Sequence, residues 1–562
     1  MRKVKTGVKL SISVLSSIAL LTSCFQDGGD SPIPASSKPA GGVPSQDVPS
    51  EAYRPPIDLT FVKDTSGLEE LLKQFPGETL EDNRWSRLYE QELGIRIKYD
   101  WLAATGDQYR QKLGFSLATG NIPDVVRVDT QQLMQLSNAG LIQDLSDAYV
   151  QYAAPFTKQV LGQEGNSPFE AAMIDGKLMG IPELSSSIEG AQYLWIRTDW
   201  LDNLGLQPPR TMEELLAISK AFTEDDPDRN GKKDTFGLAM SNYLWDPVAG
   251  IMDFMAGYEA YPRLWLKDSN GRLAFGGIQP EVKTALKALQ ELYRDGQIDG
   301  EFSMKDGAKV KNDVADGRIG IVYGEQWSSF WLGLGRERNP NASWQAFPIV
   351  GIAGLTPKVP LPFSTSQYLA VRKGYAHPEA IVKLINLHLE KNWGAAAEYK
   401  TYYSTPYPAW QLSPVTPFPP KKNLEAYRQL DIARRTGDNS ALKDEAKAIQ
   451  KNIDLYLAGG ANSEMGWGWE RTYGASGAFA VLDRYEKDGQ LLYENYVGGP
   501  TETMIERQPI LNNLLLDTYM NIILGRPIQD FDRFVEEWLR LGGDQITSEV
   551  NQWYSERGRN LK

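Results

Sequence analysis

Residues 107–142 read DQYRQKLGFSLATGNIPDVVRVDTQQLMQLSNAGLI. This stretch predicts a helix over Asp107–Leu117 that ends at Thr119-Gly120, a buried strand over Pro123–Val128, and a helix over Gln131–Asn138 that stops at Gly140. A short apolar run between two helical patterns is typical of a strand whose connections are crossover helices. The stretch therefore predicts an α/β fold with a mostly parallel sheet.

The residues before this stretch repeat the alternation. Strands are predicted over Ile57–Val62 and Ile95–Trp101, with a helix over Trp85–Leu93 between them. Ligands of open α/β sheets gather at the carboxyl ends of the strands. Those ends fall near Asp64, Trp101 and Asp129, so we expect ligand contacts there.

The chain continues well beyond one such unit. About 500 residues follow the N-terminal region, which is too many for one hydrophobic core, so two or more lobes are expected. A second unit is predicted from near Ala191, with strands over Tyr193–Arg197, Arg318–Tyr323 and Tyr368–Val371 and helices over Val282–Tyr293 and Pro378–Glu390. The tail, Leu511–Asn551, returns to amphipathic helices.

The N-terminus has the layout of a secretory signal. Four basic residues precede the apolar stretch Leu10–Leu21, which is too short to span a bilayer as a stable helix. It ends in Leu21-Thr22-Ser23-Cys24, which resembles the bacterial lipobox, and Cys24 is the only cysteine of the chain, so no internal disulfide can form. We expect residues 1–23 to be a signal peptide, Cys24 to be acylated, and residues 24–54 to be a flexible tether. An ordinary signal peptide with a chance cysteine is the alternative.

Composition limits the class of ligand and of chemistry. The chain has 59 Lys and Arg against 72 Asp and Glu, which argues against nucleic acid as a ligand. Its two histidines, His377 and His388, have no cysteine or second histidine nearby in sequence, so zinc and Cys-His chemistry are poorly supported. A glycoside hydrolase needs only two carboxylates, and the sequence leaves that alternative open.

The most specific local motif is the stretch DPDRNGKKD at residues 226–234. Oxygen side chains at positions 1, 3 and 5, a glycine at 6, a backbone carbonyl at 7 and a carboxylate at 9 match the start of a calcium loop. The usual glutamate at position 12 is replaced by Gly237, so a complete EF-hand is not expected. The pattern predicts a structural Ca²⁺ site, and a polar surface turn without metal is the alternative.

The chain resembles the family 1 extracellular solute-binding proteins, the group that includes maltose- and alginate-binding proteins, and in particular their large lipoprotein branch from Gram-positive bacteria. The resemblance runs from Leu59 to Gly558 and rests on the order and spacing of short motifs: Gly94-Ile95, Lys112-Leu113, the run Ala118–Asp124, Gly140-Leu141-Ile142, Asp175-Gly176-Lys177, Gly180-Ile181-Pro182, the run Trp195–Leu201, Phe531–Phe534, Trp538, Gly542-Gly543 and Glu549-Val550-Asn551.

This resemblance implies two discontinuous α/β lobes that are joined by hinge segments and close on a ligand between them. We expect a first lobe over residues 55–190, a second over 191–315, a return to the first over 316–365, and mainly second lobe with hinge-crossing C-terminal helices over 366–562. The resemblance also implies calcium ligands at Asp226, Asp228, Asn230, the Lys232 carbonyl and Asp234, with Thr235 where alginate-binding members have a further acidic ligand.

A sugar-binding cleft needs aromatic platforms and polar side chains around them. Trp327 resembles the tryptophan of the family's cleft, and glycines flanking Trp467 and Trp469 suggest an exposed loop. The predicted ligand-binding residues are Trp327, Trp467, Trp469, Arg197, Trp101, Asp129, Glu325, Trp200 and Trp245. For any single aromatic residue, packing in the core is the alternative.

The expected function is therefore that of a non-enzymatic, lipid-anchored solute-binding protein on the outer face of the cell membrane. It would be a monomer that captures an oligosaccharide, polysaccharide-derived or acidic, and delivers it to the permease subunits of an ABC importer. A peptide or another metabolite remains an alternative ligand, and a secreted glycoside hydrolase the alternative activity.

Overall fold

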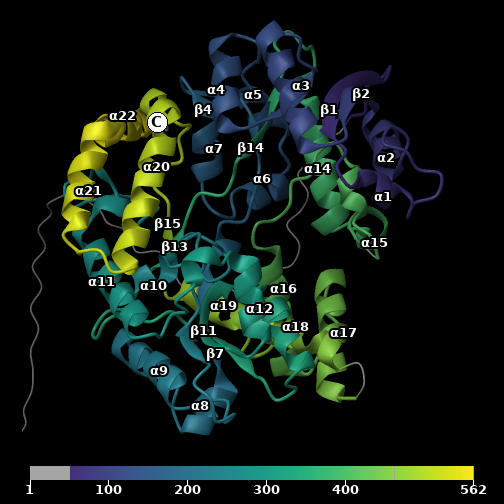
Figure 1. Ribbon diagram of the computed structural model, residues 1–562. Coiled ribbons are helices and arrows are strands. Elements are labelled where there is room, and N and C mark those ends of the chain that lie inside the picture. Colours follow the sequence, from purple (N-terminus) through teal and green to yellow (C-terminus); the bar gives the residue numbers. More distant parts are fainter. Residues whose placement is uncertain (1–50, 405, 461–462, 561–562) are drawn as a thin grey trace, which may run out of the picture. The chain divides into compact units, whose positions relative to one another are not determined.

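The computed structural model describes residues 51–404, 406–460 and 463–560 (Figure 1). The predicted signal peptide, Cys24 and nearly all of the tether lie outside these residues. Within the described part of the chain, no helix has both the length and the apolar character needed to cross a bilayer.

Two separate hydrophobic cores organise the described residues into two lobes. One core is built from residues 59–184, 368–415 and Val497, and the other from residues 188–361, 424–485 and 504–550. We call them the first and the second lobe. The two-lobed prediction is confirmed.

The first lobe contains five strands in its sheets, a small hairpin, and the helices around them. Its strands are β1 (Ile57–Asp64), β2 (Ile95–Ala103), β3 (Val125–Val128), β6 (Ile181–Glu183) and β14 (Gln367–Val371), with the hairpin β4 (Met173–Ile174) and β5 (Lys177–Leu178). Its helices are α1 (Leu68–Leu72), α2 (Arg84–Leu93), α3 (Gly106–Thr119), α4 (Thr130–Asn138), α5 (Ser146–Tyr152), α6 (Pro155–Leu161), α7 (Ser167–Ala172), α14 (Ala380–Trp393) and α15 (Tyr399–Tyr402).

The second lobe has shorter strands and more helices. Its strands are β7 (Gln192–Arg197), β8 (Phe236–Leu238), β9 (Trp265–Lys267), β10 (Leu273–Phe275), β11 (Ile319–Glu325), β12 (Trp344–Phe347), β13 (Val359–Leu361) and β15 (Leu491–Tyr493). Its helices are α8 (Thr198–Leu204), α9 (Met212–Glu224), α10 (Met252–Ala256), α11 (Pro280–Arg294), α12 (Gly307–Ala315), α13 (Ser328–Leu332), α16 (Lys422–Thr436), α17 (Asp444–Ala458), α18 (Glu464–Tyr473), α19 (Ala478–Lys487), α20 (Glu502–Ile523), α21 (Asp530–Trp538) and α22 (Asp544–Asn560).

Local sequence signals fix the ends of the first helices. The side chain of Asn83 caps α2 by accepting hydrogen bonds from the backbone N–H groups of Trp85 and Ser86. Asp129 caps α4 in the same way. Helix α3 ends at Gly120, whose φ of 69° is left-handed and favours glycine, so the predicted stop is confirmed.

The sheets are mixed rather than mostly parallel. Strands β1 and β2 pair in parallel, but β14 runs antiparallel to both β3 and β6. In the second lobe the order is β12-β7-β11-β8, and β7 runs antiparallel to β11 and to β12. The prediction of a mostly parallel sheet is therefore wrong, because chain segments entering from the other lobe add strands in the opposite direction.

The chain passes between the two cores three times up to Leu424, and it returns briefly to the first core at Val497 before the C-terminal helices. It crosses between Leu184 and Ile188, between Leu361 and Tyr368, and between Val415 and Leu424. The predicted boundaries need correction at two places. Residues 316–365 belong to the second lobe, because β11 pairs with β7 and β8, and residues 366–415 belong to the first, because β14 pairs with β3 and β6.

Candidate functional site

A cavity of about 370 Å³ lies where β1 and β3 of the first lobe end. Its wall includes Lys63 and Asp64 from β1, Arg127 and Asp129 from the end of β3, and Pro414 from the segment just before the third crossing. Two of the three strand ends marked in the sequence, near Asp64 and Asp129, thus line one cavity. The third, Trp101, does not line it, although its ring lies 5.4 Å from that of Tyr109, which does.

Arg127 and Glu183 form the central ion pair of this cavity. The guanidinium binds Glu183 through Nε and Nη2, and Nη2 also donates to the hydroxyl of Thr416 at 3.2 Å. Glu183 is buried, whereas 38% of the Arg127 side chain remains exposed. Arg127 therefore keeps a surface toward the cavity although its charge is paired.

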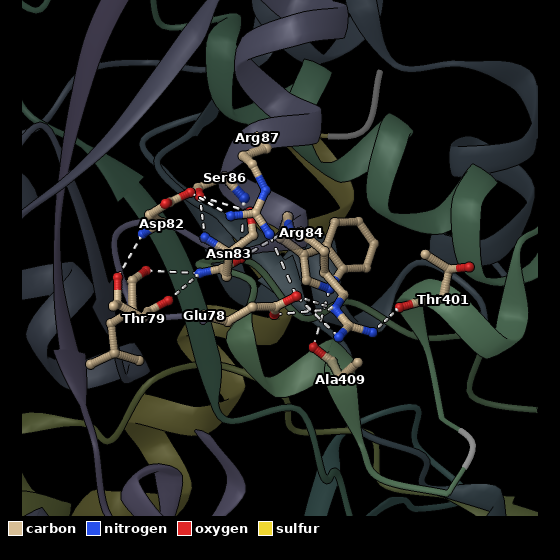
Figure 2. Close-up of polar contacts among 11 residues, drawn as sticks. Glu78, Thr79, Asp82, Asn83, Arg84, Ser86, Arg87, Thr401 and Ala409 are labelled. Carbon is tan, nitrogen blue, oxygen red and sulfur yellow. Dashed lines mark hydrogen bonds and ion pairs between the residues drawn. The ribbon is translucent and has the colours of Figure 1, made fainter. Parts of the chain in front are cut away.

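Hydrogen bonds from several first-lobe side chains fasten the segment that carries Pro414. Lys63 Nζ donates to the carbonyl oxygens of Gln411 at 2.9 Å and Ser413 at 2.6 Å. The first turn of α2 binds the residues that precede this segment. Arg84 Nη1 donates to the Thr401 carbonyl at 2.7 Å, and Trp85 Nε1 donates to the Ala409 carbonyl at 3.2 Å (Figure 2). The wall of the cavity is thus anchored to the sheet before the chain crosses to the second lobe.

An aromatic cluster follows the end of β11 in the second lobe. Trp327 lies 5.5 Å from Phe330, 6.4 Å from Trp469 and 6.1 Å from Tyr473, measured between ring centres. Trp327 and Trp469 are partly buried, and Phe330 is exposed. The hydroxyl of Ser329 donates to the Gly468 carbonyl at 2.9 Å, which joins α13 to α18. The cluster is a partly exposed, rigid aromatic surface.

Polar groups lie at the same end of the strand. Burial raises the pKa of Glu325, which pairs in register with Gln192 of β7. Within the described residues, both side-chain polar atoms of the fully buried Gln326 lack a hydrogen-bond partner, as do both carboxyl oxygens of Asp253. Burial and, secondarily, the charge of Glu325 raise the pKa of Asp253 well above its ordinary value, which favours its neutral form.

The structure corrects the predicted positions of Arg197 and Trp200. Because β7 runs antiparallel to β11, Arg197 at its carboxyl end lies at the opposite edge of the sheet from Glu325. Arg197 is buried, binds Asp199 through two nitrogens, and lies over the ring of Trp200 at 4.5 Å. Trp200 has no exposed surface. Trp200 belongs to the core, and the buried Arg197 lies at the far end of its strand from the aromatic cluster.

Trp467 is also a core residue. The glycines beside it suggested an exposed loop, but residues 464–473 form helix α18. Trp467 faces the core with 2% of its surface exposed, and Trp469 lies on the exposed side of the helix. The glycines instead permit close packing: a Cβ at Gly468 would lie 2.8 Å from the Phe330 ring.

Trp245 packs against the long helix α20. It is half-buried, and its ring lies 6.0 Å from that of Tyr519 on α20. Sequence reasoning missed Lys63, Arg127, Tyr99 and Phe330. The strand-end rule would have found Arg127, because it precedes Val128 by one residue, but an arginine inside an apolar strand is not by itself a ligand signal.

The acidic loop at residues 226–234 folds around its own side chains. The backbone N–H groups of Asn230 and Gly231 donate to the two carboxyl oxygens of Asp226, both at 3.0 Å, and Gly231 has a φ of 76°. The Asn230 amide nitrogen donates to Asp228 at 2.8 Å and to Asp234 at 3.1 Å. Partial burial and the nearby carboxylates raise the pKa of Asp228.

The oxygen ligands of this loop can bind calcium only if the Asn230 side-chain amide rotates. In the described part of the chain, no three His, Cys, Asp or Glu side chains are placed as a metal site. In the loop, the Asn230 amide nitrogen lies between two carboxylates, and its oxygen accepts a hydrogen bond from the Lys232 backbone N–H at 2.7 Å. A cation between the carboxylates requires this hydrogen bond to break and the amide to turn its oxygen inward. Thr235 cannot replace the acidic ligand, since it is buried and its hydroxyl donates to the Phe222 carbonyl.

Two α/β lobes, three crossing segments and polar and aromatic groups at strand ends define a two-lobed ligand-binding protein. The sequence matches the family of bacterial extracellular solute-binding proteins over residues 62–400, and the chain belongs to this family. The family consists of binding proteins, so the chain is not an enzyme, and the hydrolase alternative is set aside.

Two curated relatives come from Bacillus subtilis. The polygalacturonan/rhamnogalacturonan-binding protein YtcQ is 33% identical over 217 residues, which is 38% of this chain and 41% of that protein. Lipoprotein LipO is 25% identical over 479 residues, or 83% of this chain and 87% of that protein. The chain thus spans less than half of the first relative and most of the second.

Solved structures with the same fold share little sequence. An extracellular solute-binding protein of Bifidobacterium longum subsp. infantis has a TM-score of 0.62 at 17% identity, covering 89% of this chain and 98% of that one. The alginate-binding protein AlgQ2, solved without calcium ion, has a TM-score of 0.54 at 15% identity, covering 91% and 100%. An EF-hand mutant of the Streptococcus pneumoniae protein FusA with fructo-nystose has 0.55 at 16%, covering 90% and 100%. These likenesses confirm the fold.

Proposed function

We propose that the chain captures an oligosaccharide between its two lobes and delivers it to the permease subunits of an ABC importer. The observation that carries this proposal is the partly exposed cluster of Trp327, Phe330 and Trp469 beside the carboxyl of Glu325. Sugar rings present apolar C–H faces and a rim of hydroxyls, so flat aromatic surfaces next to polar groups bind them well.

The first-lobe cavity supplies the second half of this binding surface. It is bordered by Pro414, which directly precedes the third crossing, and it is lined by charged and hydroxyl groups. The named ligands of related proteins support a saccharide, since YtcQ binds polygalacturonan or rhamnogalacturonan and FusA was solved with fructo-nystose. A thermal-shift screen of the purified protein against neutral and acidic oligosaccharides tests the proposal. We expect at least one to raise the melting temperature; a peptide library that does so while every sugar fails would contradict it.

We further propose that residues 226–234 hold a structural Ca²⁺. Asp226, Asp228, Asn230, the Lys232 carbonyl and Asp234 would be its ligands, and the ion would stabilise the turn between α9 and β8. The loop is already fastened to α8, because the Asn203 amide donates to the Pro227 carbonyl at 2.8 Å and Arg229 donates to the Asn203 carbonyl at 2.6 Å. The EF-hand of FusA supports a cation site in proteins of this fold.

Export and anchoring complete the proposal. Cys24 would carry lipid after removal of residues 1–23, and the protein would act as a monomer on the extracellular face of the membrane, held by that lipid alone. The relative LipO, itself a lipoprotein, supports this arrangement.

A further inference from the structure

The first-lobe cavity contains more hydrogen-bond donors than acceptors. Three cationic side chains line it: Lys63, Arg110 and Arg127. Tyr99 also lines it, and the hydroxyl of Tyr99, shielded from solvent, has no hydrogen-bond partner among the described residues. An enclosed hydroxyl without a hydrogen-bond partner costs free energy unless a ligand or a water molecule forms a hydrogen bond with it.

The two carboxylates of the wall are already engaged. Asp64 accepts hydrogen bonds from the backbone N–H of Ser66 at 2.9 Å and from its hydroxyl at 2.6 Å. Asp129 accepts from the backbone N–H of Gln132 at 2.8 Å, as the cap of α4. Oδ1 of each carboxylate is used within its own loop, and the donors that the wall offers to a ligand are its N–H and O–H groups.

Lys63 is the least satisfied of the cations. Its contacts are two neutral carbonyl oxygens, those of Gln411 and Ser413. Burial, and secondarily the charge of Arg127, lower the pKa of Lys63 to about 7. The titratable groups that interact with it are Arg127 on β3, Glu183 on β6 and His388 on α14. Those that line the same cavity are Tyr99 on β2, Tyr109 and Arg110 on α3, Asp129 at the N-cap of α4, and Asp64 next to Lys63 on β1. The one carboxylate that favours its charged form, Glu183, is paired with Arg127.

We propose that this cavity takes a carboxylate-bearing sugar, a uronate residue of the oligosaccharide, with Lys63, Arg127 and the Tyr99 hydroxyl as its donors. A carboxylate supplies two acceptor oxygens and the negative charge that Lys63 lacks. This inference rests on the proposed function and narrows its ligand to acidic oligosaccharides. It also places the ligand close to the hinge, because Lys63 holds Gln411 and Ser413, which lead into the third crossing.

Proton uptake on binding gives a direct readout. At pH 8 most Lys63 side chains are neutral in the free protein, and a bound carboxylate would favour the ammonium form. We expect titration calorimetry of trigalacturonate in buffers of different ionisation enthalpy to show uptake of most of one proton. The methyl ester of trigalacturonate should bind at least about tenfold more weakly and show little uptake, because hydrogen bonds to charged groups are the stronger ones.

Two variants with matched controls locate the effect. Lys63→Met should abolish the proton uptake, whereas Lys158→Met, which removes a lysine that donates to the Val150 carbonyl on α5, should not. Tyr99→Phe removes a hydroxyl that has no hydrogen-bond partner among the described residues, so the variant should fold normally and bind trigalacturonate about tenfold or more weakly. Tyr149→Phe, outside the cavity, should bind like the parent.

The outcomes separate this inference from the function on which it rests. Equal affinity for trigalacturonate and its ester, or binding of neutral oligosaccharides alone, overturns the uronate assignment and leaves the proposed function intact. A Tyr99→Phe variant that binds trigalacturonate as the parent does, with proton uptake that survives Lys63→Met, also overturns it. Failure of every oligosaccharide to bind overturns both.

Discussion

Oε1 of Glu189 accepts a hydrogen bond of 2.7 Å from Nδ2 of Asn423. Glu189 follows the first crossing between the lobes and Asn423 lies at the end of the third, so this contact ties two hinge segments at the second lobe. Burial raises the pKa of Glu189 to about 7, although Lys422 and the Asn423 amide oppose the shift. The hinge therefore contains a carboxyl that titrates near neutral pH.

This carboxyl should make stability depend on pH. Its pKa rises from 4.5 in the unfolded chain to about 7 in the folded protein, so the folded state binds more protons in between. The stabilisation is present below pH 4.5 and is lost as the pH rises through 7. Glu494, whose pKa burial also raises to about 7, acts in the same direction. Glu189→Gln should flatten the decline in urea-unfolding free energy between pH 5 and 7, and a profile as steep as that of the surface control Glu301→Gln would contradict this.

Trp327 should be a binding residue rather than a core residue. An aromatic platform contributes roughly 0.5 to 3 kcal/mol, so Trp327→Ala should weaken oligosaccharide binding by up to about a hundredfold. Because Trp327 is only partly buried, Trp327→Ala should destabilise the fold less than Trp200→Ala does. Removing the fully buried ring of Trp200 should lower the free energy of unfolding by roughly 3 to 5 kcal/mol. Calorimetry measures the affinity of both variants and denaturant melts measure their stability. A Trp327→Ala protein that is as unstable as Trp200→Ala, and that binds the oligosaccharide with unchanged affinity, would place the Trp327 ring in the core.

Calcium should stabilise the folded protein through residues 226–234. An ion that binds only the folded state adds about 2.7 kcal/mol at a hundredfold excess over its dissociation constant. Chelation should therefore lower the melting temperature, and added Ca²⁺ should restore it. In Asp228→Asn the response should be much weaker, because one of the carboxylates beside the Asn230 amide is lost. If neither chelator nor calcium changes the melting temperature of the parent protein, and elemental analysis finds no metal in it, the loop is a turn without metal.

Cys24 should carry the membrane anchor. Cells fed labelled palmitate should incorporate label into the parent protein and not into Cys24→Ala, since Cys24 is the only cysteine of the chain. The variant should be released from the membrane fraction. Equal labelling of both proteins would contradict lipidation at this residue.

Local signals in the sequence predicted the positions of helices and strands better than they predicted which strands pair with one another. The stops at Gly94 and Gly120 and the strands near Ile57 and Val125 are where the spacing of apolar residues put them. Strand direction and order were not accessible, because β14 joins β3 from 239 residues further along the chain, counted from Val128 to Gln367. The lobe boundaries at residues 316–365 and 366–415 were misassigned for the same reason.

The site could be predicted only in part, because the exposure of a side chain depends on which way its helix or strand faces. Trp467 and Trp469 are two residues apart, and a helix puts one toward the core and the other outward. Arg197 has the right chemistry at the wrong edge of its sheet, since β7 is antiparallel. Tyr99 carries no sequence signal at all, and only its enclosed, unpartnered hydroxyl marks it.

The central claim is that this protein binds an oligosaccharide and releases it unchanged. The most direct measurement is calorimetric titration of the purified Cys24→Ala protein with oligosaccharides of the galacturonate and fructose series, followed by mass spectrometry of the recovered sugar. The account predicts saturable binding of one ligand per chain for at least one of these sugars, and a recovered ligand of unchanged mass after prolonged incubation. Shortened products, or no binding heat from any oligosaccharide, would contradict it.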